Sequence, residues 1–569
     1  MIPARGSAPA PLAYAGEAGQ QVKMLGSLPV VVSFCRRLGI AQLIDCAAPI
    51  RDVATLTAGQ AVEAMVCNRL TSPAPLVHIE DWARTWAVEE FLGIGPCSLN
   101  DDKLGRTLDA IAPHLEQITS AAAVRAITEF SIDISQLHWD MTSFSLHGAY
   151  DGTDQDYPEP RYGHPKDRRP DLLQIQAGIA AAGDGGIPVY HRAYDGGAAE
   201  VSQVTAAMTA LKKIAGPRTF LLIGDSKLIS YDNVAAVAGQ GCTFLAPASK
   251  AYVKAAELAA CDLAGATEVT YAAQRDARKS PERRGSWHVL EDDQPFAIRN
   301  PKRKKDPPIT VRRIFVHSSA RASGAAAGRA KKLARARDDL GRLVRGLGGR
   351  FYPDEKAATE RLRQIAVTRK VGPYLRYTVT TTPAADGAGA TEGAGTAGMA
   401  GTGSGGPGKP ALTWRFDQDV IDAEAATDGW YALLTNLDPS VTAAEVLLRY
   451  KGQEAVERRY GNLKGPLAVA PIFLHSNRRV AALISVISLA LLVFCLIERE
   501  ARRSLAPQTK VDGLYNRQPA RPTGRLILTT LASLRLTPAT ATTPAQITRP
   551  SPVQARLLEL LGVDPTRPP

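Results

Sequence analysis

The order of strand-like and helix-like segments between residues 131 and 250 constrains the fold of this chain more than any other feature. Alternating apolar residues bounded by turn signals predict five strands, and two helical segments separate the last three of them. In chain order these are strands at 137–148, 172–183 and 187–197, a helix at 201–214, a strand at 219–225, a helix at 230–238 and a strand at 242–249. The first three strands predict an antiparallel meander, and the whole series predicts an α/β sheet.

This order is that of a ribonuclease-H-like core, and it carries two carboxylates at strand positions. Asp140 lies in the first strand, QLHWDMTSFSLHG, and Asp225 ends the fourth, TFLLIGD. Alternation along the first strand puts His138, Asp140 and Thr142 on one face. His138 either orients a carboxylate there or is a core histidine, and the core interpretation is favoured.

A third carboxylate belongs to a helical stripe within LLRYKGQEAVERRYGNLKGP. Tyr450, Gln453, Glu457 and Lys464 follow one another at offsets of three, four and seven residues, so on one helix they share a face. Glu454 also lies near this stripe and is the alternative to Glu457. We choose Glu457 because Tyr450 and Lys464 each lie seven residues from it.

Three carboxylates far apart in sequence indicate phosphoryl transfer. Two Mg²⁺ ions about 3.5 to 4 Å apart can activate the nucleophile and neutralise the leaving oxygen of a phosphodiester. Mg²⁺ prefers hard oxygen ligands, which Asp and Glu supply. No Cys/His set in the sequence has the spacing of a zinc site.

The net charge of the 569-residue chain is +12, which favours a polyanionic partner, although a soluble basic protein is the alternative. A helix rich in Arg and Lys is predicted at 322–347, where phosphate contact is favoured over simple solvation. Trp287 either stacks on an extruded base or is structural, and the structural interpretation is favoured. Seven scattered cysteines without CxxC spacing favour a reducing cytosol.

Composition and periodicity predict seven segments. Near the N-terminus, Thr57 and Gln60 have the spacing of a capping box, and Asn100 has the position of a helix cap. The segments are a disordered leader (1–25), an all-helical domain (26–128), the first part of the core (129–250), a basic insertion domain (251–383), a Gly/Ala-rich linker (384–410), the second part of the core with the Glu457 helix (411–505) and a C-terminal tail (506–569).

The run of eighteen uncharged residues at 480–497 is about 27 Å long as a helix, close to the ~30 Å of a bilayer core. Basic residues flank it on both sides and give no clear inside-outside asymmetry. A buried core helix is favoured over a single membrane span, so no membrane partner is expected.

Taken together, these motifs resemble the DDE transposases of bacterial insertion sequences, in the insertion-sequence-4 superfamily and nearest its 1634-type branch. That family shares a Tyr, two residues, Arg, three residues, Glu, six residues, Lys signature. It reads here Tyr450, Gln453, Glu457, Lys464, with glutamine in place of the arginine. The resemblance also covers LNDDKLGRTLD near residue 100, HWDMTSFSLHG, HPKDRRPDLLQ, IGDSKL and the segment from APIFLHSNRR to FCLIE.

The resemblance implies that Asp140, Asp225 and Glu457 bind two Mg²⁺ or Mn²⁺ ions and cut and join DNA at insertion-sequence ends. It implies that Tyr450 and Lys464 hold phosphates, with Gln453 and the adjacent Arg458 as further DNA contacts. Gln453 lacks the charged fork of arginine, so weaker end binding is expected. The helical domain is expected to bind DNA ends or to dimerise.

The partners implied are terminal inverted repeats, target DNA and a second copy of the chain, in the cytoplasm or on the nucleoid. The alternatives are a metal-dependent nuclease without strand transfer and an inactive DNA-binding remnant of a transposon.

Overall fold

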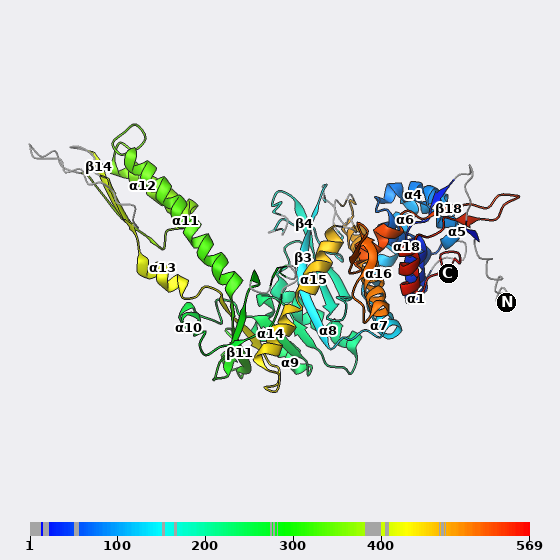
Figure 1. Cartoon of the computed structure of the whole chain (residues 1–569), viewed down its shortest axis with the longest axis horizontal. Helices are drawn as coiled ribbons and strands as arrows, with labels where there is room; N and C mark the ends of the chain where they lie inside the picture. Colours follow the sequence, from blue (N-terminus) through cyan, green and yellow to red (C-terminus); the bar gives the residue numbers. More distant parts are fainter. Residues whose placement is uncertain are drawn as a thin grey trace, which may run out of the picture. The chain divides into compact units, whose positions relative to one another are not determined.

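The computed structural model is a mixed α/β structure whose chain divides into two compact units (Figure 1). Unit 1 comprises Met1–Ala246, Ile298–Ile309 and Arg449–Pro569, and unit 2 comprises Pro247–Ala297 and Thr310–Leu448. The structure describes residues 13–14, 22–49, 56–148, 150, 154–163, 165, 168–272, 276, 279–280, 283–381, 400–403, 409–465, 467, 472 and 474–568. Most of the predicted leader and linker, and part of the HPKDRRPDLLQ motif, lie outside these residues.

The sheet of unit 1 has the predicted strands in the order β5-β4-β3-β6-β7. β3 pairs antiparallel with β4, and β4 with β5, whereas β3, β6 and β7 run parallel. The bounds are β3 (Gln136–Leu146), β4 (Leu173–Ala182), β5 (Pro188–Tyr194), β6 (Leu221–Ile223) and β7 (Thr243–Pro247). Helices α8 (Glu200–Ala215) and α9 (Tyr231–Gly239) precede the two parallel strands that follow the meander, as predicted.

The long helix α16 (Asn477–Leu505) is the central core element of unit 1. It is long and apolar enough to cross a membrane, but its apolar window is entirely buried within the protein. It packs against β5 and the N-terminal helices α1, α3, α6 and α7, beside which Figure 1 shows it in orange. The predicted position of this segment as a buried core helix is therefore confirmed.

The N-terminal part is helical from Leu28 to Phe130, as predicted. Thr57 and Gln60 form the predicted capping box at the start of α3, and the Asn100 side chain caps α6. The bounds are α1 (Leu28–Leu38), α2 (Ile40–Ala47), α3 (Ala58–Thr71), α4 (Ile79–Thr85), α5 (Val88–Leu92), α6 (Asp101–Ile111) and α7 (Leu115–Phe130).

The C-terminal segment, predicted only as a tail at 506–569, contains short strands and helices. Its short strands pair with two strands inside the predicted leader, since β1 (Ala13–Tyr14) pairs with β19 and β2 (Lys23–Met24) with β18. Apolar residues scattered between prolines are fully buried there, among them Leu531, Ile547 and Leu557. The elements are β16 (Val511–Tyr515), β17 (Gln518–Ala520), α17 (Gly524–Leu531), β18 (Arg535–Thr537), β19 (Gln546–Ile547) and α18 (Pro552–Leu561).

Unit 2 extends further than the predicted insertion, because it continues to Leu448 and leaves Ile298–Ile309 to unit 1. One of its sheets has the order β15-β11-β9-β8, with β10 paired to β11. The bounds are β8 (Thr267–Glu268), β9 (Trp287–Glu291), β10 (Phe296–Ile298), β11 (Ile309–Ser318) and β15 (Trp430–Thr435), with the short helix α10 (Ala255–Ala259) beside them in sequence.

A second part of unit 2 has its own hydrophobic core, around Leu340, Leu362 and Trp414. Its sheet has the order β12-β14-β13, so residues 400–403 of the predicted linker form a strand. The successive strands LTWRF and GWYALLTN do not pair with each other, because β14 pairs with β12 and β13, and β15 with β11. The bounds are α11 (Ser319–Arg345), α12 (Glu355–Thr368), β12 (Leu375–Thr381), β13 (Ala400–Gly403), β14 (Pro410–Phe416) and α13 (Gln418–Ala425).

Candidate active site

Two neighbouring parallel strands lead to Asp140 and Asp225. β3 pairs with β6 so that His138 lies opposite Ile223. Asp140 lies two residues further along β3, and Asp225 comes two residues after the end of β6. The charges of both carboxylates act on the same neighbouring group, Glu200, so the two aspartates share one neighbourhood. Asp140 Oδ1 accepts a hydrogen bond from the Met141 amide at 2.8 Å. Asp225 Oδ1 accepts one from the Lys227 amide at 2.8 Å.

An ion pair that the sequence analysis did not find lies beside these two aspartates. Glu200, the first residue of α8, is 9% exposed and accepts a hydrogen bond from Lys227 Nζ. Burial raises the pKa of Glu200, and the charges of Asp225 and Asp140 raise it against the opposing effect of Lys227. The only sequence signal for this group was the position of Lys227, two residues after Asp225. Glu200 is far from both aspartates in the chain and has no motif.

Helix α15 (Glu454–Lys464) packs against β3 and β4, and Figure 1 shows it beside β3. At its start, Gln453 Oε1 lies 3.1 Å from His138 Nδ1, and Gln453 Nε2 donates to the carbonyl of Trp139 at 3.2 Å. Further along, the Tyr460 hydroxyl donates to the carbonyl of Asp140.

The last residue of α15, Lys464, also contacts β3. Lys464 Nζ lies 5.5 Å from the centroid of the Phe144 ring on β3. Glu457 lies on α15 between the Gln453 and Lys464 contacts, and its side chain is exposed.

The predicted stripe does not lie on one uninterrupted helix. α14 (Ala443–Lys451) ends before Gly452, and Gln453 stands at the N-cap position of α15 without a side-chain capping bond. The amides of Gly452 and Gln453 bond to the carbonyls three residues earlier, Arg449 and Tyr450, so the turn is tightened here. A Cβ on Gly452 would lie 2.9 Å from His138 Cε1, so close packing on β3 requires glycine. This break changes the angular phase of Tyr450 relative to Glu457.

The proposed DNA-binding residues differ in what their side chains do. Tyr450 is half-buried and has Lys451 Nζ 5.8 Å from its ring centroid. Arg458 and Lys464 are exposed, and Arg458 Nε donates to the Glu454 carbonyl at 3.2 Å. Both polar ends of the Gln453 amide are engaged by β3, which the sequence analysis did not foresee.

His138 is a core histidine, as the favoured interpretation held. It is fully buried, with Nδ1 facing Gln453 Oε1 and Nε2 lying 3.0 Å from the Gln136 amide nitrogen. A neutral ring with its proton on Nδ1 satisfies both contacts. Burial lowers the pKa of His138 to about 4, although the hydrogen bond to Gln453 opposes this.

This pKa predicts a pH dependence of stability. Because the folded pKa lies below the unfolded value of about 6.5, the stabilisation is complete above pH ~6.5 and is lost as pH falls toward 4. The loss is on the order of 3 kcal/mol from this residue. Urea unfolding of the wild type and His138→Gln at several pH values checks it, because the variant should show a shallower decline. Equal declines in both would contradict the assignment.

No group of three or more His, Cys, Asp or Glu side chains is arranged as a metal site among the residues that the structure describes. The chemistry of Asp140 and Asp225 nevertheless suits a hard divalent cation, since both carboxylates lie near Glu200 and Lys227 and so share one neighbourhood. Glu457 lies on the helix that packs against β3, but it is not gathered with the two aspartates into such a group.

Unit 2 contains Trp287 and the predicted basic helix. Trp287 is 9% exposed on β9 and meets the Tyr271 ring edge-on at 5.8 Å, which agrees with a structural tryptophan. The predicted basic helix is α11, whose Lys331 and Arg335 are exposed while Arg329 is buried in an ion pair with Asp428. Phosphate contact by α11 stays a prediction.

Comparisons with known proteins give limited matches. Residues 20–119 match the family model of a domain of unknown function, DUF4277. None of the curated proteins is similar to the chain in sequence. Among solved structures, the piggyBac transposase synaptic complex with hairpin DNA is similar over 90% of this chain and 82% of that chain, at 8% identity and a TM-score of 0.38. A superposition this loose does not define a shared fold, so the strand order and the side-chain contacts of unit 1 carry more weight.

Proposed function

We propose that the chain is a DNA transposase of the DDE type, which cuts at insertion-sequence ends and joins the freed 3′ ends to target DNA. The observation that carries the proposal is the parallel pairing of β3 with β6, together with the charges of Asp140 and Asp225 that both act on Glu200 and Lys227. The strand order of unit 1, typical of ribonuclease-H-like cores, and the motif resemblance support it.

In this proposal Asp140, Asp225 and Glu457 hold two Mg²⁺ or Mn²⁺ ions. Bound there, the ions supply charge neutralisation at the attacking and leaving oxygens of the phosphodiester. The protein contributes the spacing of the carboxylates. Lys227, which is paired with Glu200, adds a positive charge near Asp140 and Asp225. This charge partly offsets the repulsion between the two aspartates.

The DNA contacts that we propose are Tyr450, Arg458 and Lys464, which lie along or next to the helix that carries Glu457. Gln453 has a different role in the proposal. Because its amide bonds to His138 and to the Trp139 carbonyl, it positions the start of α15 on β3. A glutamine suits this place, since an arginine would bring a charge against a buried neutral imidazole.

The test uses oligonucleotides that end in the terminal repeats flanking the gene, together with a supercoiled target plasmid and Mg²⁺. We expect cleavage at the repeat end and a covalent product between the 3′ end and the plasmid, both absent in EDTA. Cleavage without a joined product would favour a nuclease. Salt-sensitive DNA binding without any Mg²⁺-dependent product would indicate an inactive remnant.

A further inference from the structure

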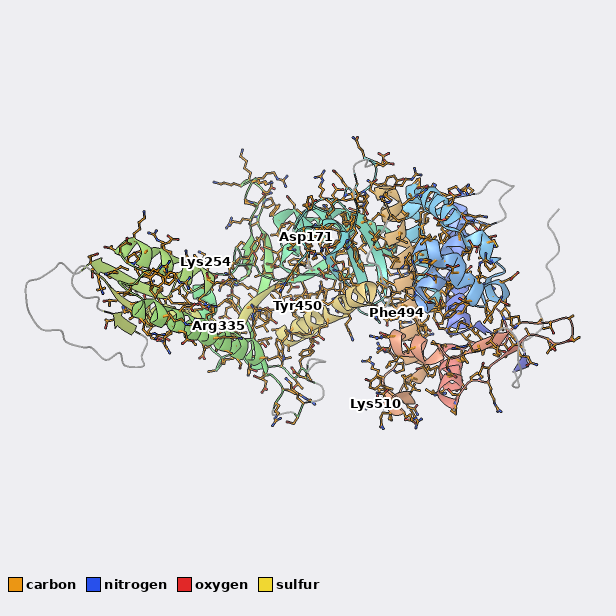
Figure 2. All side chains as sticks on the ribbon, turned by 90° about the horizontal axis from the view of Figure 1, so that it is seen from above. Asp171, Lys254, Arg335, Tyr450, Phe494 and Lys510 are labelled. Carbon is orange, nitrogen blue, oxygen red and sulfur yellow. The ribbon has the colours of Figure 1, made fainter. Side chains whose placement is uncertain are left out.

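The C-terminal segment, which contains none of the motifs discussed above, includes a basic β-hairpin. β16 and β17 pair antiparallel, and residues 510–525 contain four basic residues against the single acid Asp512. All four basic side chains are exposed: Lys510, Arg517, Arg521 and Arg525. Figure 2 shows Lys510 at the outer edge of unit 1, with neighbouring side chains extending into solvent.

The base of the hairpin is fixed to the helix core by buried polar contacts. Arg502 Nε on α16 donates to the Pro522 carbonyl at 2.7 Å. The Glu498 side chain is 6% exposed. Its Oε1 forms ion pairs with Arg459 at 3.1 Å and with Arg502 at 2.8 Å, and its Oε2 accepts a hydrogen bond from the Gly524 amide at 2.8 Å. These contacts hold the hairpin in one place and use both oxygens of the local carboxylate.

More positive charge gathers at this place than Glu498 balances. The pKa of Arg502 is lowered to about 10, chiefly by burial and also by the neighbouring Arg521, Arg459 and Arg458, while Glu498 opposes the shift. Arg458 and Arg521 reach the surface. An anion placed over them would relieve this mutual repulsion.

The hairpin tip has a backbone that most residues avoid. Asn516 and Arg517 both have positive φ, 48° and 60°, and they separate the paired residues Tyr515 and Gln518. Such two-residue turns strongly favour Asn followed by Gly. An arginine at the second position is an outlier of the kind that occurs at functional sites. Beside it, the Tyr515 ring is 55% exposed.

Arg521 of the hairpin lies close enough to Arg458 for its charge to lower the pKa of Arg458, and Arg458 directly follows Glu457 on α15. We propose that Arg458, Arg517, Arg521 and Lys510, the hairpin surface, bind the phosphate backbone of double-stranded DNA and guide it to the Glu457 helix. This inference rests on the proposed function. It adds a surface outside the carboxylate site that anchors the DNA.

The experiment measures binding of full-length protein to a labelled DNA duplex in EDTA, over a series of salt concentrations. Arg517→Ala/Arg521→Ala should bind roughly 50-fold more weakly near 0.1 M salt, with a log–log salt slope smaller by about 2, since two phosphate contacts are lost. Arg517→Gly should also bind more weakly while unfolding at a higher urea concentration, because glycine suits the positive φ.

The matched control is Arg556→Ala/Arg567→Ala, which removes the same charge from two ion-paired arginines of the same C-terminal segment. It should keep most of the wild-type affinity and slope. If the hairpin variant and this control bind alike, the hairpin surface is wrong, while end cleavage by the wild type would still support the proposed function. If the wild type shows no salt-dependent duplex binding, both proposals fail.

Discussion

Asp140→Asn and Asp225→Asn are each expected to reduce Mg²⁺-dependent cutting of terminal-repeat DNA on the order of 10³-fold or more, the scale at which lost charge stabilisation affects a transition state. Asparagine keeps the size of the side chain and an acceptor oxygen. In Asp225→Asn that oxygen still accepts from the Lys227 amide, so the local turn is retained. The negative charge that holds a divalent cation is lost. Rates of end cleavage under single-turnover conditions measure the effect.

Asp232→Asn is the matched control, because Asp232 is an exposed carboxylate of unit 1 paired with Arg303. It should cut at the wild-type rate. All variants should bind duplex DNA in EDTA as the wild type does, which separates lost chemistry from lost folding. Wild-type cutting by both Asn variants would refute the assignment of the two aspartates.

The third carboxylate is decided by comparing Glu457→Gln with Glu200→Gln. The proposal expects Glu457→Gln to be as inactive as the aspartate variants and Glu200→Gln to retain cutting. The reverse result would assign the third ligand to Glu200, which already shares the neighbourhood of Asp140 and Asp225.

Glu498→Ala is expected to lower the free energy of unfolding of unit 1 by about 3 to 5 kcal/mol, the cost of breaking a buried ion pair by removing one partner. Arg459 is 6% exposed, and the variant would leave its guanidinium buried without the carboxylate it faces. The Gly524 amide would lose its acceptor as well. Urea unfolding monitored by circular dichroism measures the change.

Two controls accompany this variant. Glu559→Ala removes an exposed acid that pairs with Arg556 on α18, and it should change stability little because such pairs are screened by water. The second control is the pH dependence of the free energy of unfolding. Burial alone would raise the pKa of Glu498, but Arg459 and Arg502 lower it below its ordinary value. Its stabilisation is therefore present above pH ~4.3 and is lost as pH falls through the folded pKa, a decline that Glu498→Gln should lack. An unfolding free energy unchanged in Glu498→Ala would contradict the network.

Local periodicity explains which expectations the structure reproduces. Alternation in QLHWDMTSFSL predicted β3 and the common face of His138 and Asp140, and the capping box at Thr57 predicted the start of α3. Both signals depend on residues within a few positions of one another, so the neighbouring sequence contains the whole cause. The burial of α16 was predictable for a similar reason, because its apolar side chains surround the helix on all sides.

The break at Gly452 shows where such reasoning stops. A helical stripe was expected from Tyr450 to Lys464, but His138, more than 300 residues earlier in the chain, lies against Gly452 and takes the Gln453 amide. The folding of the C-terminal segment depends likewise on strands near the N-terminus. Composition cannot reveal partners that are distant in sequence.

The sequence by itself determined the local elements, the face of β3 that bears Asp140, and the strand-like segment that Asp225 follows, because backbone dihedrals and side-chain spacing are local properties. Only the tertiary structure decided that β3 and β6 are neighbours, that Glu200 lies near both Asp140 and Asp225, and that α15 packs against β3. These depend on which surfaces bury one another, and burial energy is set by the packing of the whole unit.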